Sequence, residues 1–252
     1  MATYKKRSFK KNPIPNNSRS LENKSATANV FNKLDEGSSK TQQWVQDNKN
    51  KILALFAIIV LSIIGYFSYY KFVIEPNERE ALNKMYFAQK TFLDEALLTQ
   101  SDSLYSVVLN GDGINLGMID IIENYDGTSA ANIANYVTGM TYFKIKDYDN
   151  AIKFLLNFES ESYLFVSLAK GTIGDAYSEL NKYSDALEYY LDAADDNNFT
   201  TPIYLFKAGS IAMKINKFSK AEELFKRIKL EYPNSPEATN IDAYISKAAA
   251  SN

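Results

Sequence analysis

The chain has 252 residues, enough for one sizeable domain and additional segments. Its formal net charge of −2 hides an uneven distribution. Residues 1–51 carry eleven Lys and Arg against four Asp and Glu, whereas residues 71–252 carry seventeen against twenty-six. The sequence contains no cysteine and no histidine, which excludes disulfides, Cys/His zinc sites, thiol nucleophiles and a Ser-His-Asp triad.

Residues 1–51 form a basic arm. Residues 1–25 are rich in Lys, Arg, Asn and Ser, a composition that buries too little apolar surface to fold and therefore predicts disorder. A cluster of cations lies at Lys5, Lys6, Arg7, Lys10 and Lys11. This cluster either contacts anionic lipid headgroups or ribosomal RNA, or is a solvated signal that sets membrane topology, and the second is favoured. Residues 27–48 predict two short helices on either side of Gly37, the second at the bilayer surface.

Residues 52–70 read ILALFAIIVLSIIGYFSYY, a run of nineteen residues without a charge. At about 1.5 Å per residue such a helix spans the roughly 30 Å hydrocarbon core of a bilayer. A buried core helix or a cleavable signal peptide is disfavoured, because the run is long, begins at residue 52 and has no small-residue cleavage site. Lys49 and Lys51 precede the run, so the positive-inside rule predicts a cytoplasmic N-terminus and export of residues 71–252.

Residues 130–235 show an internal repeat with an interval of thirty-five residues. The repeated columns are Gly139/Gly174/Gly209, Tyr148/Tyr183/Phe218, Ala151/Ala186/Ala221 and Leu155/Tyr190/Phe225. We interpret each unit as a helical hairpin, in which glycine lets the second helix approach closely and alanine is the small residue at the crossing. Asn181 and Asn216 lie between the two helices of their units, where asparagine suits the left-handed conformation that ends a helix.

These columns resemble the G-x-x-Y, aromatic and A-x-x-x-[LYF] positions of the tetratricopeptide repeat (TPR) family, with Tyr142 and Tyr177 at the tyrosine position and Ala212 in its place in the third unit. The resemblance implies a TPR-like α-solenoid of helical hairpins, and together with the transmembrane helix predicted above it makes the chain all-α. The family's opening tryptophan is missing, and the period is one residue longer than usual, which leaves the superhelical twist open. The expected segments are the arm 1–51, the transmembrane helix 52–70, a junction 71–77 and a domain 78–252. Within that domain we expect an N-terminal hairpin 78–125, clear repeats at about 132–166, 167–201 and 202–235, and a cap helix 236–249.

By the same resemblance, the first helix of each hairpin lines a concave groove for a partner. The expected lining is Ile133, Tyr136, Met140, Phe143 and Lys144, then Leu168, Gly171, Asp175, Ser178 and Glu179, then Ile203, Phe206, Ser210, Met213 and Lys214. An apolar lining that faces solvent indicates a protein or peptide ligand. The alternative is that another helix of the chain packs there and makes these residues part of the core, and the sequence leaves both open.

No pattern in the sequence predicts catalysis, a cofactor or a resident metal. Asp195–Asn198 is interpreted as a solvated turn rather than a cation site, because hard-cation loops need more regularly spaced oxygen ligands. The Gly111-Asp112-Gly113 stretch lacks the following Lys-Ser/Thr of a phosphate loop. Glu159 and Glu161 are expected to be surface carboxylates without a partner base. We therefore do not expect an enzyme.

The layout of basic arm, single span and repeat domain is similar to that of the YfgM-type ancillary subunits of the SecYEG translocon, and the composition is similar to that of Bacteroidota. This resemblance implies a single-pass protein of the bacterial inner membrane with its C-terminal domain in the periplasm. The implied partners are SecYEG, a PpiD-type periplasmic chaperone, emerging unfolded chains and membrane lipid. Nucleic acid is not expected, apart from ribosome contact by the arm. The alternative is a TPR scaffold of another envelope assembly, such as a secretion or gliding apparatus.

Overall fold

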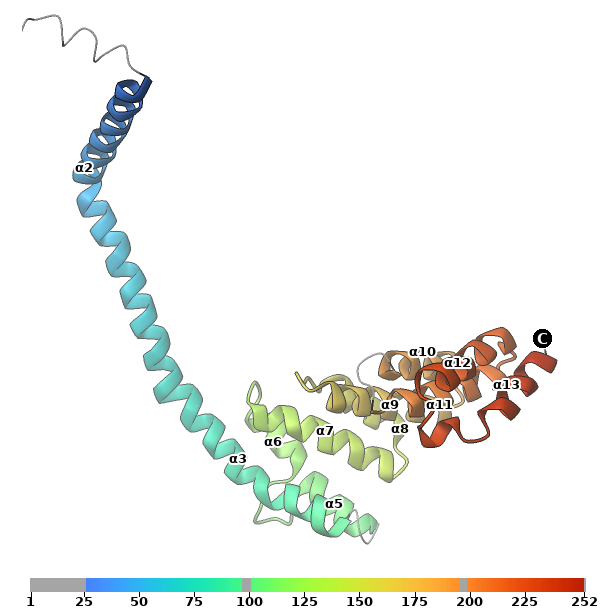
Figure 1. The fold of residues 1–252 in the computed structure, drawn as a ribbon. Helices are drawn as coiled ribbons and strands as arrows, with labels where there is room; N and C mark the ends of the chain where they lie inside the picture. The colour runs from blue at the N-terminus through green and yellow to red at the C-terminus, as the bar shows by residue number, and fades with distance from the viewer. Residues whose placement is uncertain (1–25, 97–100, 195–198, 252) are drawn as a thin grey trace, which may run out of the picture. The chain divides into compact units, whose positions relative to one another are not determined.

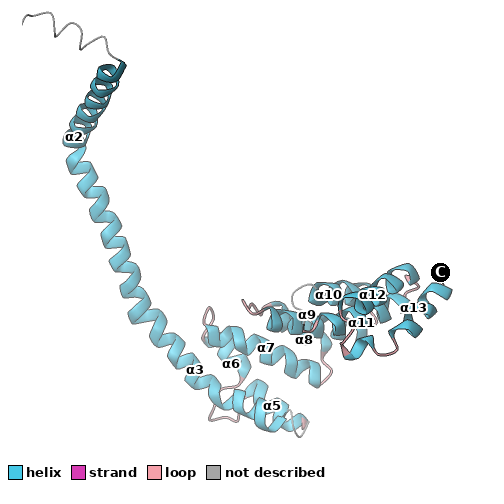
Figure 2. Ribbon diagram, in the orientation of Figure 1, coloured by secondary structure: helices cyan, strands magenta, loops and turns pink. Residues whose placement is uncertain are grey.

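The computed structural model of the protein describes residues 26–96, 101–194 and 199–251, and the side chains of residues 41–94, 101–194 and 199–251. All regular elements within these ranges are helices (Figure 2), which confirms the all-α prediction. Two predictions, disorder of residues 1–25 and a turn at Asp195–Asn198, lie outside the described residues. The chain divides into two compact units, residues 1–69 and 70–252.

The first unit contains one long helix, α2 (Ala26–Tyr69). We expected two short helices around Gly37, and this prediction is wrong, because α2 continues through that glycine. A single glycine costs a helix interior about 1 kcal/mol, which is too little to break a helix that continues on both sides. Leu53, Phe56 and Leu61 are each more than half exposed. Within the described residues, one helix is long and apolar enough to cross a membrane, and it contains this stretch.

The second unit begins with short helical elements rather than a hairpin. They are the π-helical turn η1 (Tyr70–Ile74), α3 (Glu75–Lys90), η2 (Thr91–Ala96), α5 (Asp102–Asn110) and α6 (Met118–Asn124). The expected junction 71–77 is therefore helical, because Pro76 lies in the first turn of α3, where its missing N–H is tolerated. Residues 78–125 are several helices instead of the single hairpin we expected, and Tyr105, Met118 and Ile121 form their buried core with α3.

Consecutive helical hairpins follow, and each helix packs against the next along the chain (Figure 1). Their helices are α7 (Ser129–Lys144) with α8 (Tyr148–Leu156), α9 (Tyr163–Glu179) with α10 (Tyr183–Ala194), and α11 (Thr201–Lys214) with α12 (Phe218–Glu231). The short 3₁₀ turn η3 (Pro236–Ala238) and α13 (Ile241–Ala250) then cover α12. The crossing residues Ala151, Ala186 and Ala221 are completely buried, as the repeat predicts.

Glycine sets the distance between the two helices of each hairpin. A Cβ atom built on Gly174 would lie 2.7 Å from the Tyr190 ring, and one built on Gly139 or Gly209 would lie 2.6 Å from Leu155 or Phe225. Real Cβ contacts are longer than this, so the second helix approaches as closely as it does only because the side chain is missing. The predicted role of the glycine column is confirmed.

The turns between the paired helices are the same in successive repeats. Lys146, Asn181 and Asn216 have φ values of +65°, +58° and +59°. Around Asn181, the N–H of Asn181 donates to Ser178 O at 3.1 Å and the N–H of Lys182 donates to Tyr177 O at 2.9 Å. The first repeat makes the corresponding bonds around Lys146, although lysine suits this conformation less well than asparagine. The cap prediction for both asparagines is confirmed.

Substituting the close-approach glycine tests the hairpin packing. Gly174→Leu should lower the free energy of unfolding by about 1–3 kcal/mol, because the new side chain collides with the Tyr190 ring. Urea unfolding of the full chain in detergent micelles, followed by circular dichroism, measures the change. Glu188→Leu, at an exposed position on α10, is the matched control and should change stability by less than about 0.5 kcal/mol. Equal loss in both variants would contradict the packing at this crossing.

The left-handed turn residues allow a reciprocal exchange. Lys146→Asn should raise the free energy of unfolding by about 0.5–1 kcal/mol, because asparagine tolerates a positive φ that lysine adopts at a cost. Asn181→Lys should lower it by a similar amount. The same urea titration measures both variants, and a loss of stability in Lys146→Asn would contradict the assignment of equivalent turns.

Candidate protein-binding groove

The second unit carries an open cavity of about 920 Å³ between its N-terminal helices and the first clear hairpin. We call it the α7–α9 groove. One wall comes from the end of α3, through Gln89, and from η2, through Phe92 and Leu93. The floor comes from Tyr136 of α7 together with Phe158 and Phe165, and the rest of the non-helical segment 158–162 forms the opposite wall. The groove therefore lies where three separate parts of the chain meet.

Four aromatic side chains, Phe92, Tyr136, Phe158 and Phe165, line the groove. The Tyr136 ring centroid lies 4.9 Å from that of Phe158 and 6.0 Å from that of Phe165, in tilted and edge-on arrangements. Phe165 remains 48% exposed, and Leu93 on the facing wall remains 52% exposed. Burial also raises the pKa of the Tyr136 phenol, so this residue presents a neutral ring at physiological pH. The groove therefore exposes apolar side chains to solvent in the absence of a ligand.

Polar contacts hold the walls of the groove in place. The Asn132 side chain donates to Glu159 O at 2.7 Å and accepts from the Glu159 N–H at 2.9 Å, which attaches segment 158–162 to α7. On the other side, Glu78 accepts from the Ser129 N–H at 3.0 Å and from the Ser129 hydroxyl, which attaches α3 to the start of α7. The carboxylate of Glu78 also meets the positive end of the α7 dipole there.

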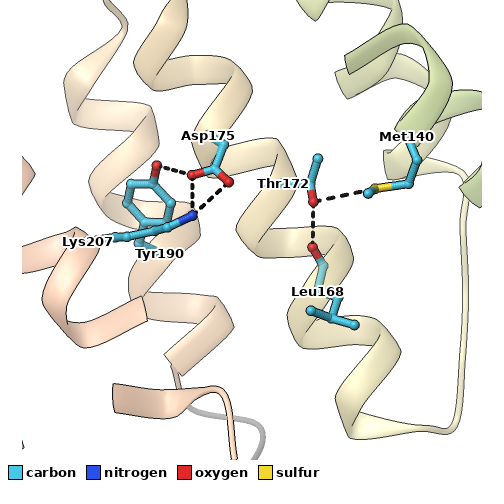
Figure 3. Close-up of polar contacts among 6 residues, drawn as sticks. All are labelled: Met140, Leu168, Thr172, Asp175, Tyr190 and Lys207. Carbon is cyan, nitrogen blue, oxygen red and sulfur yellow. Dashed lines mark hydrogen bonds and ion pairs between the residues drawn. The ribbon is translucent and has the colours of Figure 1, made fainter. Parts of the chain in front are cut away.

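The predicted groove residues of the first repeat divide between the cavity and the core. Ile133 and Tyr136 line the α7–α9 groove. Met140 and Phe143 are half-buried, with the Thr172 hydroxyl donating to Met140 Sδ at 3.6 Å (Figure 3) and the Phe143 ring 5.6 Å from that of Tyr148. Lys144 is exposed.

Two predicted residues of the second repeat, Gly171 and Asp175, contact the first helix of the third repeat. The Tyr204 ring of α11 covers Gly171 so closely that a Cβ there would overlap it. Asp175 accepts two hydrogen bonds from Lys207 Nζ, at 2.7 and 2.8 Å, and one from the Tyr190 hydroxyl at 2.6 Å (Figure 3). Lys207 also lies over the rings of Tyr190 and Tyr204, at 5.6 and 5.7 Å from their centroids.

The remaining predicted residues of this repeat do not line the α7–α9 groove. Leu168 is half-buried and its carbonyl accepts from the Thr172 hydroxyl at 2.9 Å (Figure 3). Ser178 is half-buried, and Glu179 is exposed.

One predicted residue of the third repeat, Phe206, is covered by the C-terminal helix. The Phe206 ring lies 4.9 Å from that of Tyr244 on α13 and 5.8 Å from that of Phe225. Met213 is half-buried against the same core cluster. Ile203 is exposed and lines a smaller cavity of about 440 Å³, while Ser210 and Lys214 are exposed. Of the predicted set, Ile133 and Tyr136 are thus the residues that line the larger cavity.

Most residues that line the groove are absent from the predicted set. Phe92, Leu93, Phe158 and Phe165 carry no signal from the thirty-five-residue repeat, because they lie outside its matched columns. The one available signal was the density of aromatic residues between positions 154 and 165. Glu159 and Glu161 were recognised only as surface carboxylates.

The tyrosines at the seam of the second and third hairpins have raised pKa values. Burial is the main cause for both Tyr190 and Tyr204, and the nearby Asp175 carboxylate adds to it by opposing a second negative charge. The pKa of Tyr204 is raised to about 12. Both phenols are therefore neutral in the folded protein, and the Tyr190 hydroxyl can donate to Asp175.

This raised pKa predicts alkaline destabilisation. Above about pH 10 the unfolded chain releases the Tyr204 proton while the folded chain retains it, so the unfolded state binds fewer protons and stability falls as pH rises toward about 12. Urea unfolding at about pH 8 and about pH 11 measures the loss, and Tyr204→Phe should remove about 1 kcal/mol of it. Tyr86→Phe, at an exposed position, is the control. An unchanged loss in Tyr204→Phe would contradict the buried neutral phenol.

Comparison with protein families identifies two segments of the second unit. Residues 169–195 and residues 204–235 each match a tetratricopeptide repeat model. These segments contain most of α9 with α10, and most of α11 with α12. A comparison with curated proteins gives no match. Tetratricopeptide repeats are therefore present in the chain, and they coincide with the hairpins built around Gly174 and Gly209.

Proposed function

We propose that the chain is a non-enzymatic, membrane-anchored interaction subunit of the bacterial inner membrane, which associates with the SecYEG translocon and a periplasmic chaperone and assists exported chains. The observation that carries the proposal is the α7–α9 groove, an open apolar surface within a domain of tetratricopeptide repeats. Such repeats are typically protein-interaction scaffolds, and exposed apolar surface of this kind marks a site for a protein partner.

The first unit supports the membrane part of the proposal. Residues 52–70 lie almost entirely within α2, and their side chains from Ile52 to Tyr69 are solvent-exposed except for half-buried Val60. An uncharged helix of this length is stable in lipid because it satisfies its own backbone hydrogen bonds. The excess of Lys and Arg in residues 1–51 favours a cytoplasmic N-terminus, with residues 71–252 in the periplasm.

A purification and a topology experiment test the proposal together. The tagged full chain, purified from its native membranes in mild detergent, should recover translocon subunits and a periplasmic chaperone. Tyr136→Ala should reduce the recovery of exported chains several-fold, whereas Tyr86→Ala, an exposed aromatic outside the groove, should not. Protease added to spheroplasts should digest residues 71–252.

Two results would contradict this function. Recovery of components of a secretion or gliding apparatus without channel subunits would assign the scaffold to another envelope assembly. Protection of residues 71–252 in spheroplasts, followed by digestion after lysis, would reverse the orientation and remove the periplasmic partners.

A further inference from the structure

We propose that the α7–α9 groove binds an extended segment of an incompletely folded polypeptide, in which a large apolar side chain is flanked by Lys or Arg. This inference rests on the proposed function and specifies the chemistry of what the groove receives. It is carried by three features of the groove, which are its aromatic floor, its acidic wall and the open backbone of segment 158–162.

The aromatic floor selects a large apolar side chain. Tyr136, Phe158 and Phe165 surround a space whose far side is Leu93, and Phe165 and Leu93 are each about half exposed. A cavity of about 920 Å³ is large enough for several side chains of a bound segment. An anchoring Phe, Leu or Met would cover this exposed surface and remove it from water.

The wall beside this floor is acidic. Glu159 and Glu161 line the groove and are exposed, whereas neither Lys nor Arg is among the described residues that line it. A bound segment therefore meets two carboxylates without a compensating cation, which favours a basic flank and disfavours an acidic one. The same two charges oppose an anionic lipid headgroup, although the floor alone would accept an acyl chain.

The backbone of the same wall is available for pairing with a peptide. Segment 158–162 is non-helical, and within the described contacts the N–H groups of Ser160 and Glu161 donate no hydrogen bond to the protein. An extended peptide can pair with such a segment through its main chain while alternate side chains enter the groove. A helix has no main-chain groups left for this pairing, which is why we assign an extended occupant.

Segment 158–162 of the groove is preorganised in the absence of a ligand. The paired hydrogen bonds between Asn132 and Glu159 fix the wall against α7, so its ordering is not a cost of binding. The Glu159 backbone makes these bonds and leaves the carboxylate free of them. The charge of the wall can therefore be removed by substitution without releasing the wall.

Fluorescence anisotropy with defined peptides tests the proposal on the full chain in lipid nanodiscs. The probes are short fluorescein-labelled peptides with a central Phe-Leu pair and either Lys or Glu on both sides, and a third peptide with Ala-Ala between lysines. We expect the Lys-flanked Phe-Leu peptide to bind about three- to tenfold more tightly than its Glu-flanked counterpart at low salt. The difference should shrink as salt rises, and the Ala-Ala peptide should bind weakest.

Two variants distinguish the contribution of the acidic wall to peptide binding from that of the aromatic floor. The double variant Glu159→Gln with Glu161→Gln should lose the preference for lysine while retaining affinity for Phe-Leu. Phe165→Ala should weaken both Phe-Leu peptides alike. Glu188→Gln on α10 and Tyr86→Ala on α3 are the matched controls for charge and for an exposed aromatic ring, and both should bind as the unsubstituted chain does. Circular dichroism establishes that each variant is folded.

Several results would overturn the inference. They are equal affinity for the Lys- and Glu-flanked peptides, binding unaffected by Phe165→Ala, or self-association of the chain that Phe165→Ala abolishes, which would make the groove a contact between copies. If peptides fail to bind while channel subunits and the chaperone still co-purify, the inference falls and the proposed function stands. If peptides bind as expected while neither partner is recovered, the translocon assignment falls instead.

Discussion

The repeat domain depends on the contact between a glycine in the first helix of each hairpin and a large side chain in the second. Gly139, Gly174 and Gly209 each lie against a residue of the following helix, and each distance to an added Cβ is shorter than ordinary packing permits. The contact sets how closely the paired helices approach, and this in turn buries the alanine twelve residues later in the sequence. Because one hairpin cannot bury its own apolar face, the same geometry must recur for the hairpins to stack.

A second column of the repeat explains why the α7–α9 groove is open while the equivalent positions in later repeats are covered. Tyr136, Gly171 and Phe206 occupy equivalent positions in successive first helices. Gly171 is covered by Tyr204 of the next hairpin, and Phe206 is covered by Tyr244 of the C-terminal helix. The Tyr136 ring instead lies 4.9 Å from that of Phe158 and 6.0 Å from that of Phe165, and it lines the groove between α7, η2 and segment 158–162. The equivalent of Tyr204 in the preceding hairpin is Ala169, a small buried residue that adds no ring over Tyr136.

The sequence predicts the fold correctly where it contains the thirty-five-residue repeat, and less well elsewhere. The hairpins, the buried alanines and the turns at Asn181 and Asn216 recur at a fixed interval, so several columns support one another. The N-terminal helices have no such recurrence, and the sequence predicts a single hairpin for residues 78–125 where the structure has several helices. The groove was only partly predictable, because a pattern along one helix does not show which other helix covers it. Phe206 and Tyr136 share a column of the repeat. Phe206 nevertheless packs against Tyr244 of α13, whereas Tyr136 lines the cavity.

Both units present the same physical problem, which is apolar surface exposed to water. In the first unit the surface is a helix without charge over nineteen residues, and its continuous length matches what a bilayer covers. In the second unit the surface is a bounded groove with carboxylates on one wall and unpaired amides beside them. The hydrocarbon core of a bilayer suits the first, since it offers neither charge nor hydrogen bonds. It suits the second less well, because the acidic wall and the open backbone favour an occupant that has both cations and amide groups, as a polypeptide does.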